Sequence, residues 1–228
     1  EQPQSIRDTL ESRITKENVV ISAFGHNFKD IVKNIKQVQI VACGTSFNAG
    51  LVAKYWLEDI AKIPCNVEVA SEYRYRHPII LDGTLFVTIS QSGETADTLE
   101  ALKTAKKINN KIYTLCICNS EESSITRKSD LTFLTHAGPE IGVASTKAFT
   151  TQLVALALLT CSIGVTNETI DKQKEKAIVD GLKRLPGLIE ETLLQEDQIK
   201  ELAIRFKNKN SALFLGRGTM HAIAMEGA

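Results

Sequence analysis

The chain has 228 residues, and its 27 Lys and Arg balance 27 Asp and Glu, so the formal net charge at pH 7 is zero. A balanced charge gives no general attraction to nucleic acid or to a membrane surface. Hydrophobic residues make up 43% and charged residues 24%, which excludes a disordered chain. This length suits one α/β domain with extensions, and the composition favours a small-molecule partner.

Residues 1–36 predict a helical lead-in. Apolar side chains recur there at three- and four-residue spacing, first at Ile6, Leu10 and Ile14 and then over residues 28–35.

From Val38 onward, short apolar runs alternate with longer amphipathic segments. Two of the runs are apolar at nearly every position, as expected of strands that helices cover on both faces. The pattern predicts an α/β fold, a three-layer doubly wound sheet with five parallel strands. The strands are expected at residues 38–44, 66–71, 84–90, 112–118 and 131–136, with helices at residues 47–62 and 95–107.

Three helical segments are expected after the sheet. An apolar helix over residues 144–163 is too short to span a bilayer in its most hydrophobic part and predicts a buried position. A charged helix over residues 167–195 is expected to break near Pro186, and an amphipathic stretch runs to Lys207. We find no signal peptide or lipidation motif.

The end of the chain repeats an earlier pattern. SALFLGRGTMHAIAMEGA has the order of VQIVACGTSFNAGLVA: an apolar strand, a Gly-Thr turn and a helix of small residues, so Gly218 and Thr219 match Gly44 and Thr45. This predicts a first domain at residues 37–195 and the start of a second copy at residues 196–228. Because the chain begins without Met and stops within a helix, we expect a longer parent protein.

Two polar turns, CGTSFN and SQSGET, follow predicted strands. In an open parallel sheet, ligands bind where strands turn into helices, and helix N-termini attract anions. Hydroxyl, amide and backbone donors without a cation predict a neutral phosphate cradle, although simple capping of the next helix by Ser92 or Thr95 is an equal alternative. Glu94 would repel a phosphate and receives no ligand role. The donors of SQSGET are Ser90, Gln91, Ser92 and Thr95, with Gly93 allowing close approach, and the other turn adds Thr45 and Ser46.

Several other site classes are excluded or disfavoured. The chain contains neither G-x-G-x-x-G nor G-x-x-x-x-G-K-[ST], which argues against dinucleotide and P-loop nucleotide sites. Five scattered cysteines without a C-x-x-C pair indicate a reducing, cytoplasmic setting and no metal site. The four histidines are isolated in sequence, and Lys147, at a helix start, is expected to be solvated.

The stretches CGTSFNAG, SQSGETADT and EIGVASTKAFTTQL, in this order and spacing, closely resemble the sugar isomerase (SIS) domain. More narrowly, they resemble the first SIS domain of the glutamine-dependent fructose-6-phosphate aminotransferases, and the resemblance covers essentially the whole chain. It implies binding of fructose 6-phosphate or glucosamine 6-phosphate, without metal or organic cofactor. It also implies that the protein forms a homodimer and that a glutaminase domain precedes Glu1 in the same polypeptide.

The resemblance also implies roles for individual residues. The sugar phosphate should be held by Ser46, Ser90, Gln91, Ser92 and Thr95, and the sugar should be faced by Thr45, Val143, Ser145, Cys43 and Gly44. The family's catalytic glutamate, histidine and lysine cannot be matched here. They are expected beyond Ala228 or in a partner subunit, so we expect binding without catalysis. Glu226 is expected to be structural.

Two other hypotheses remain. A sugar-phosphate-sensing SIS domain of a transcription regulator would carry a basic helix-turn-helix before it, which the lead-in does not resemble. A single-domain phosphosugar isomerase would not begin a second copy at Gly218.

Overall fold

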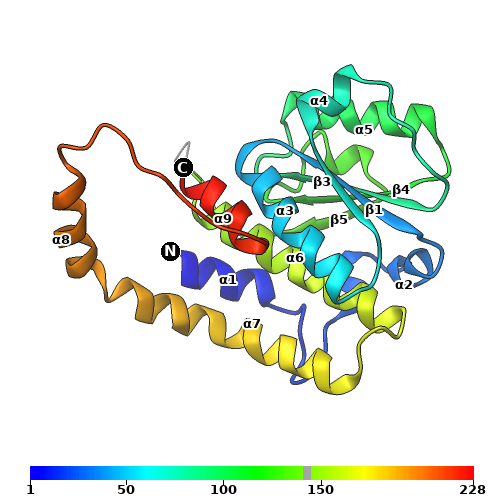
Figure 1. The fold of residues 1–228 in the computed structure, drawn as a ribbon. Coiled ribbons are helices and arrows are strands. Elements are labelled where there is room, and N and C mark those ends of the chain that lie inside the picture. Colours follow the sequence, from blue (N-terminus) through cyan, green and yellow to red (C-terminus); the bar gives the residue numbers. More distant parts are fainter. Residues whose placement is uncertain (141–144) are drawn as a thin grey trace.

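A sheet of five parallel strands lies at the centre of the molecule (Figure 1). The computed structural model describes residues 1–140 and 145–228. The strand order is β2-β1-β3-β4-β5, with every neighbouring pair parallel. All five strands lie where the apolar runs predicted them: β1 Gln37–Ala42, β2 Cys65–Val69, β3 Thr84–Ser90, β4 Tyr113–Cys118 and β5 Leu131–Leu134.

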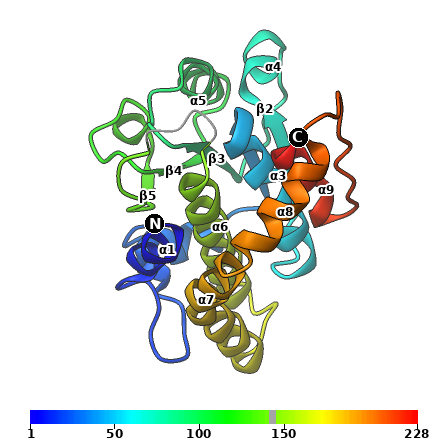
Figure 2. The ribbon, with the colours of Figure 1, turned by 90° about the vertical axis from the view of Figure 1, so that its left-hand side faces the viewer.

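Helices cover both faces of the sheet, as the doubly wound prediction required (Figure 2). Alternate strand residues face opposite layers, so Ile40 packs in one hydrophobic cluster and Val41 in the other. One layer contains α4 Ala70–Tyr75 and α5 Ala96–Ile108, with the short η2 Thr126–Lys128 nearby. The other contains α3 Gly44–Asp59 and α6 Lys147–Thr166, covered by the lead-in.

The lead-in is helical but interrupted. It consists of α1 Gln2–Leu10, η1 Ile21–Phe24 and α2 Phe28–Val32. Between the first two, Ile14 and Val19 form an isolated antiparallel bridge. The buried carboxylate of Glu175 accepts the backbone N–H of Val19 at 2.9 Å, which ties this bend to the helix α7 Lys172–Leu193.

Helix α6 is long and apolar enough to cross a membrane, but it is a core helix. It has 20 residues, and 72% of its most apolar window is buried inside the molecule. It begins at Lys147, and this lysine corrects an expectation. Its side chain is only 9% exposed rather than solvated, because Nζ contacts the carboxylate of Glu1 at 2.6 Å.

Helix α7 continues through Pro186, so the predicted break is wrong. A proline inside a helix removes one backbone hydrogen bond and costs about 3 kcal/mol in an exposed helix. Here Pro186 is buried on the apolar face that also carries Val179 and Leu182, and α7 packs along α1. This packing offsets the lost bond and keeps the helix continuous.

The chain end forms two helices but lacks the strand expected near Leu213. After α8 Glu196–Phe206, which lies apart from the sheet in Figure 1, residues 207–218 run back as an irregular segment. Leu213 and Leu215 are more than 80% exposed. A strand requires a neighbour for its backbone hydrogen bonds, and this segment reaches no sheet edge. Helix α9 Thr219–Gly227 then forms where the repeat predicted a helix, and it packs against α3.

Candidate functional site

The two polar turns meet in one crevice at the carboxyl ends of the central strands. Parallel pairing places Ala42, at the end of β1, opposite Ile89 of β3, so CGTSFN and SQSGET emerge side by side. The crevice has a volume of about 280 Å³. Its lining residues are Cys43, Thr45, Ser46, Gln91, Ser92, Thr95, Glu140, Ser145 and Gln152.

Internal hydrogen bonds fix the shape of the SQSGET turn. The Ser90 hydroxyl accepts the N–H of Gly93 at 3.0 Å and shares a hydrogen bond of 2.9 Å with the Thr95 hydroxyl. The Ser92 hydroxyl accepts the N–H of Glu94 at 3.2 Å. Because Ser90 is buried and bonded within the turn, it shapes the crevice from behind, while Ser92 and Thr95 line it.

Gly93 is required for the turn to lie against its neighbour. Its φ is +66°, and a Cβ atom there would lie 2.0 Å from the Ser123 hydroxyl oxygen. Beside it, the Glu94 carboxylate accepts the Ser124 N–H at 2.6 Å. Hydrogen bonding to Ser124 lowers the pKa of Glu94. The carboxylate is therefore held on the neighbouring loop. This orientation agrees with the expectation that Glu94 has no ligand role.

The capping alternative does not describe these turns. Thr95 is the N-cap residue of α5, but its side chain makes no capping hydrogen bond. Cys43 is the N-cap of α3 and makes none either. Two helix N-termini therefore open on the crevice without side-chain caps, and backbone N–H groups at such ends favour a bound anion.

Two residues of the lining, Gln152 and Glu140, were not predicted from the sequence. Gln152 lies on α6 and is 1% exposed, and its Oε1 has no hydrogen-bond partner among residues 1–140 and 145–228. The available signal was that Gln152 is the single amide residue of a mostly apolar helix. Glu140 accepts hydrogen bonds from the Ser145 hydroxyl at 3.3 Å and the Ala148 N–H at 3.2 Å. An orphaned buried acceptor beside a polar crevice indicates a site built for a ligand.

Most of the predicted site residues are brought together. Gly44 and Ser90 are not in the lining: Gly44, at φ +54°, begins α3, and Ser90 is buried behind its turn. Val143 lies outside the described residues. The predicted residues found in the lining are Cys43, Thr45, Ser46, Gln91, Ser92, Thr95 and Ser145.

The resemblance to the aminotransferase family implies a catalytic glutamate beyond Ala228. Ala228 is the C-cap residue of α9, is exposed, and does not line the crevice. No role in the site is therefore assigned to Ala228 itself, and the position of the predicted glutamate stays a prediction.

The crevice lining contains no Lys or Arg among the described residues. Lys147 lies two residues after Ser145 of the lining, but its side chain is hydrogen-bonded to the Glu1 carboxylate. An anion in the crevice would therefore be held by hydroxyl, amide and backbone N–H groups. Within residues 1–140 and 145–228, no three His, Cys, Asp or Glu side chains form a cluster suited to a metal ion.

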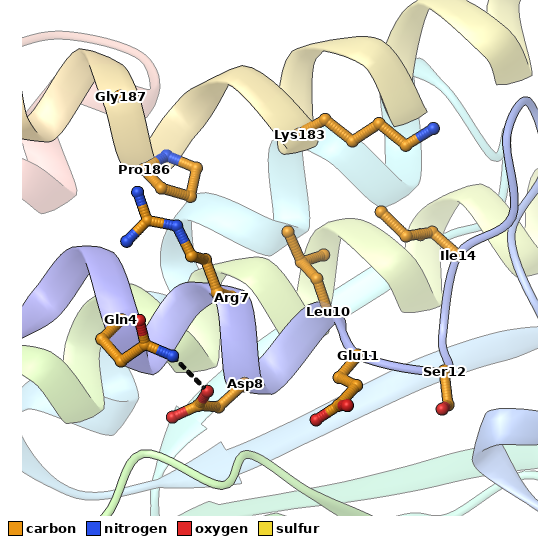
Figure 3. Close-up of a pocket in the computed structure, with 10 residues that line it drawn as sticks. All are labelled: Gln4, Arg7, Asp8, Leu10, Glu11, Ser12, Ile14, Lys183, Pro186 and Gly187. Carbon is orange, nitrogen blue, oxygen red and sulfur yellow. Dashed lines mark hydrogen bonds between the residues drawn. The ribbon is translucent and has the colours of Figure 1, made fainter.

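A larger hollow of about 550 Å³ lies between α1 and α7 (Figure 3). Several of its polar side chains already have partners. Gln4 donates to Asp8 at 2.7 Å, and Arg7 contacts Glu190 at 2.6 Å. It also lies on the lead-in, away from the strand ends, so we do not assign the ligand site to it.

The fold and the crevice together define a class. The family model of the SIS domain matches residues 31–162, which is more than half of the chain, and the chain belongs to the SIS-domain family. The match spans β1 to β5 and both polar turns.

The relatives narrow this class. The chain is 55% identical over its full length to glutamine–fructose-6-phosphate aminotransferase (isomerizing) of Idiomarina loihiensis and 54% identical to that of Pseudomonas putida. It spans 37% of the length of each. Among solved structures, it matches the C-terminal domain of glucosamine-fructose-6-phosphate aminotransferase from Francisella tularensis at 46% identity with a TM-score of 0.96. That match covers the whole of this chain and 63% of the other.

Proposed function

We propose that this chain is the sugar-phosphate-binding isomerase segment of an enzyme that makes glucosamine 6-phosphate from fructose 6-phosphate and glutamine. The observation that carries the proposal is the cation-free crevice where two uncapped helix N-termini meet the hydroxyls of two polar turns. The relatives that match the chain over its whole length carry the name of this aminotransferase. None of the comparisons described above favours a transcription regulator.

The two ends of the crevice are proposed to bind different parts of the ligand. Ser46, Gln91, Ser92 and Thr95 offer neutral donors for the phosphate, and Ser90 holds their turn in place. Thr45, Ser145 and the Cys43–Gly44 backbone are proposed to face the sugar. Many fixed hydrogen bonds orient a phosphate without one strong ion pair, which suits a ligand that must also leave.

The chemistry of this segment is binding and orientation. We propose that the groups which transfer protons and form the covalent intermediate lie beyond Ala228 in the full-length protein or come from a partner subunit, in a homodimer. A glutaminase domain of the same polypeptide is proposed to supply ammonia. Residues 37–195 would form the first SIS domain and residues 196–228 the start of a second. Five free cysteines are compatible with the proposed cytoplasmic location.

Isothermal titration with glucosamine 6-phosphate tests this function. Ser92 is exposed and its hydroxyl lines the crevice, so Ser92→Ala removes a donor without disturbing the core. A hydrogen bond to a charged group contributes about 1.5–3 kcal/mol, so affinity should fall roughly ten- to hundredfold.

The matched control is Ser211→Ala, since Ser211 is exposed in the irregular segment before α9. The control should bind as the wild type does. Equal affinities of both variants, or no binding by the wild type, would show that the assignment is wrong.

A further inference from the structure

A carboxylate from the far end of the chain lies at the sugar side of the crevice. Glu226 of α9 accepts a hydrogen bond from the Thr45 hydroxyl at 2.8 Å and another from the Asn48 side-chain amide at 2.7 Å. Thr45 lines the crevice, and Asn48 is buried one turn further along α3. The last helix is thus attached to the residue next to Ser46.

The packing of α9 holds this carboxylate in place. Ala222, one turn before Glu226, is 1% exposed and lies on the same face of the helix. Gly227 lies close to the Phe214 ring, to which an added Cβ would approach within 3.1 Å. Helix α9 packs against α3 along this face (Figure 1). Glu226 therefore approaches Thr45 from a fixed helix.

The chemistry of the pair fixes the direction of each hydrogen bond. An ionised carboxylate only accepts, so the Thr45 hydroxyl must donate its single proton to Glu226. The Thr45 oxygen retains its lone pairs and can only accept from a ligand. The dianion of a phosphate ester offers no proton for such a bond, whereas a sugar hydroxyl does.

We propose that Glu226 is a positioning residue that turns Thr45 into an acceptor for a sugar hydroxyl. The proposal deepens the function proposed above and rests on it. Through Thr45, Glu226 makes the crevice favour a phosphorylated sugar over a phosphate ester without hydroxyl groups, because that interaction exists only when a sugar hydroxyl is present. A carboxylate so placed also disfavours an anion at the sugar end.

Removal of the carboxylate should affect two probes differently. Without Glu226, the Thr45 hydroxyl is free to rotate and to donate elsewhere. We expect Glu226→Ala to weaken glucosamine 6-phosphate binding at least fivefold and to change the binding of methyl phosphate, a phosphate ester without a hydroxyl group, less than twofold. Both affinities are measured by isothermal titration at a pH where the ester is a dianion. Glu201→Ala is the matched control, because Glu201 is an exposed carboxylate on α8. It should change neither affinity.

Two further variants separate positioning from helix docking. Glu226→Met keeps a long side chain against α3 and removes both acceptor oxygens. If circular dichroism shows that Glu226→Ala is unfolded, Glu226→Met replaces it in both titrations. Glu226→Gln keeps one oxygen for Thr45, and its amide can donate to the Asn48 carbonyl after that side chain flips. We expect Glu226→Gln to restore most of the sugar-phosphate affinity.

A double-mutant cycle tests whether Glu226 acts through Thr45. In a Thr45→Val background, the Glu226 substitution should have no further effect on sugar-phosphate binding. Additive losses, or equal weakening of both probes in every Glu226 variant, would overturn the inference. Failure of the wild type to bind glucosamine 6-phosphate would instead refute the proposed function.

Discussion

The hydroxyl oxygens of Ser90 and Thr95 lie 2.9 Å apart, so one hydrogen bond joins the end of β3 to the start of α5 across the SQSGET turn. The Ser90 oxygen also accepts the Gly93 N–H, at 3.0 Å. The first and last residues of this turn therefore hold it closed, and the exposed Ser92 projects from a fixed loop.

Ser90→Ala should destabilise the fold and loosen ligand binding together. The Gly93 N–H would lose its acceptor in a buried position, which costs about 1–3 kcal/mol. We expect the free energy of unfolding, measured by urea denaturation, to fall by about this amount. Sugar-phosphate affinity measured by calorimetry should fall as well. A variant as stable as the wild type would show that the turn does not depend on Ser90.

Gly93→Ala and Gly44→Ala form a matched pair. Both glycines have positive φ, +66° and +54°, so an alanine costs about 1–2 kcal/mol of backbone strain at either position. At Gly93 the added methyl would also overlap Ser123, whereas none of the described residues lies within 4 Å of a Cβ at Gly44. We expect Gly93→Ala to lower the denaturation midpoint clearly more than Gly44→Ala. Equal shifts would contradict the contact with Ser123.

Gln152→Met should separate stability from binding. The Oε1 atom of Gln152 is buried without a partner in the part of the chain that the structure describes, and a methionine of similar length carries no such atom. The free energy of unfolding is expected to stay within about 1 kcal/mol of the wild type or to rise. Affinity for glucosamine 6-phosphate should fall severalfold in calorimetry. Unchanged affinity would mean that Gln152 is only a packing residue.

Asp130 should contribute to acid sensitivity. Burial alone raises its pKa, but hydrogen bonds from Lys106 and Thr114 outweigh burial and lower the pKa below the ordinary value of 3.8. A lowered folded-state pKa means that the contribution is complete above the unfolded-state pKa and is lost as the pH falls through the folded-state pKa.

The test for Asp130 is denaturation of Asp130→Asn and the wild type over a pH series. The two stabilities should differ most near neutral pH and converge as the pH falls from about 5 toward 2. Parallel curves would show that Asp130 does not titrate differently in the folded state. Asp180→Asn offers a control on an exposed helix surface.

The strand positions could be predicted from the sequence because a strand that is buried on both faces appears as a continuous run of apolar residues. Every residue of β3 is buried, and its stretch from Leu85 to Ile89 is apolar except for Thr88, as burial on both faces favours. The position of the crevice could be predicted in part, because parallel topology places the carboxyl ends of neighbouring strands along one edge of the sheet. Where the sequence reasoning failed, the neighbours of a segment decided: α1 supports Pro186 in α7, and the lack of a partner leaves Leu213 outside any strand.

By itself, the sequence determined the five strands, the helical layers and the two polar turns, because these depend on periodicity and local turn chemistry. Tertiary structure decided which polar groups meet. Gln152 reaches the crevice from α6, and Glu226 reaches Thr45 across 181 residues. The physical reason is that a hydrogen bond forms only when donor and acceptor are placed correctly to within a few tenths of an ångström. Only the packing of α6 and α9 against α3 sets those distances.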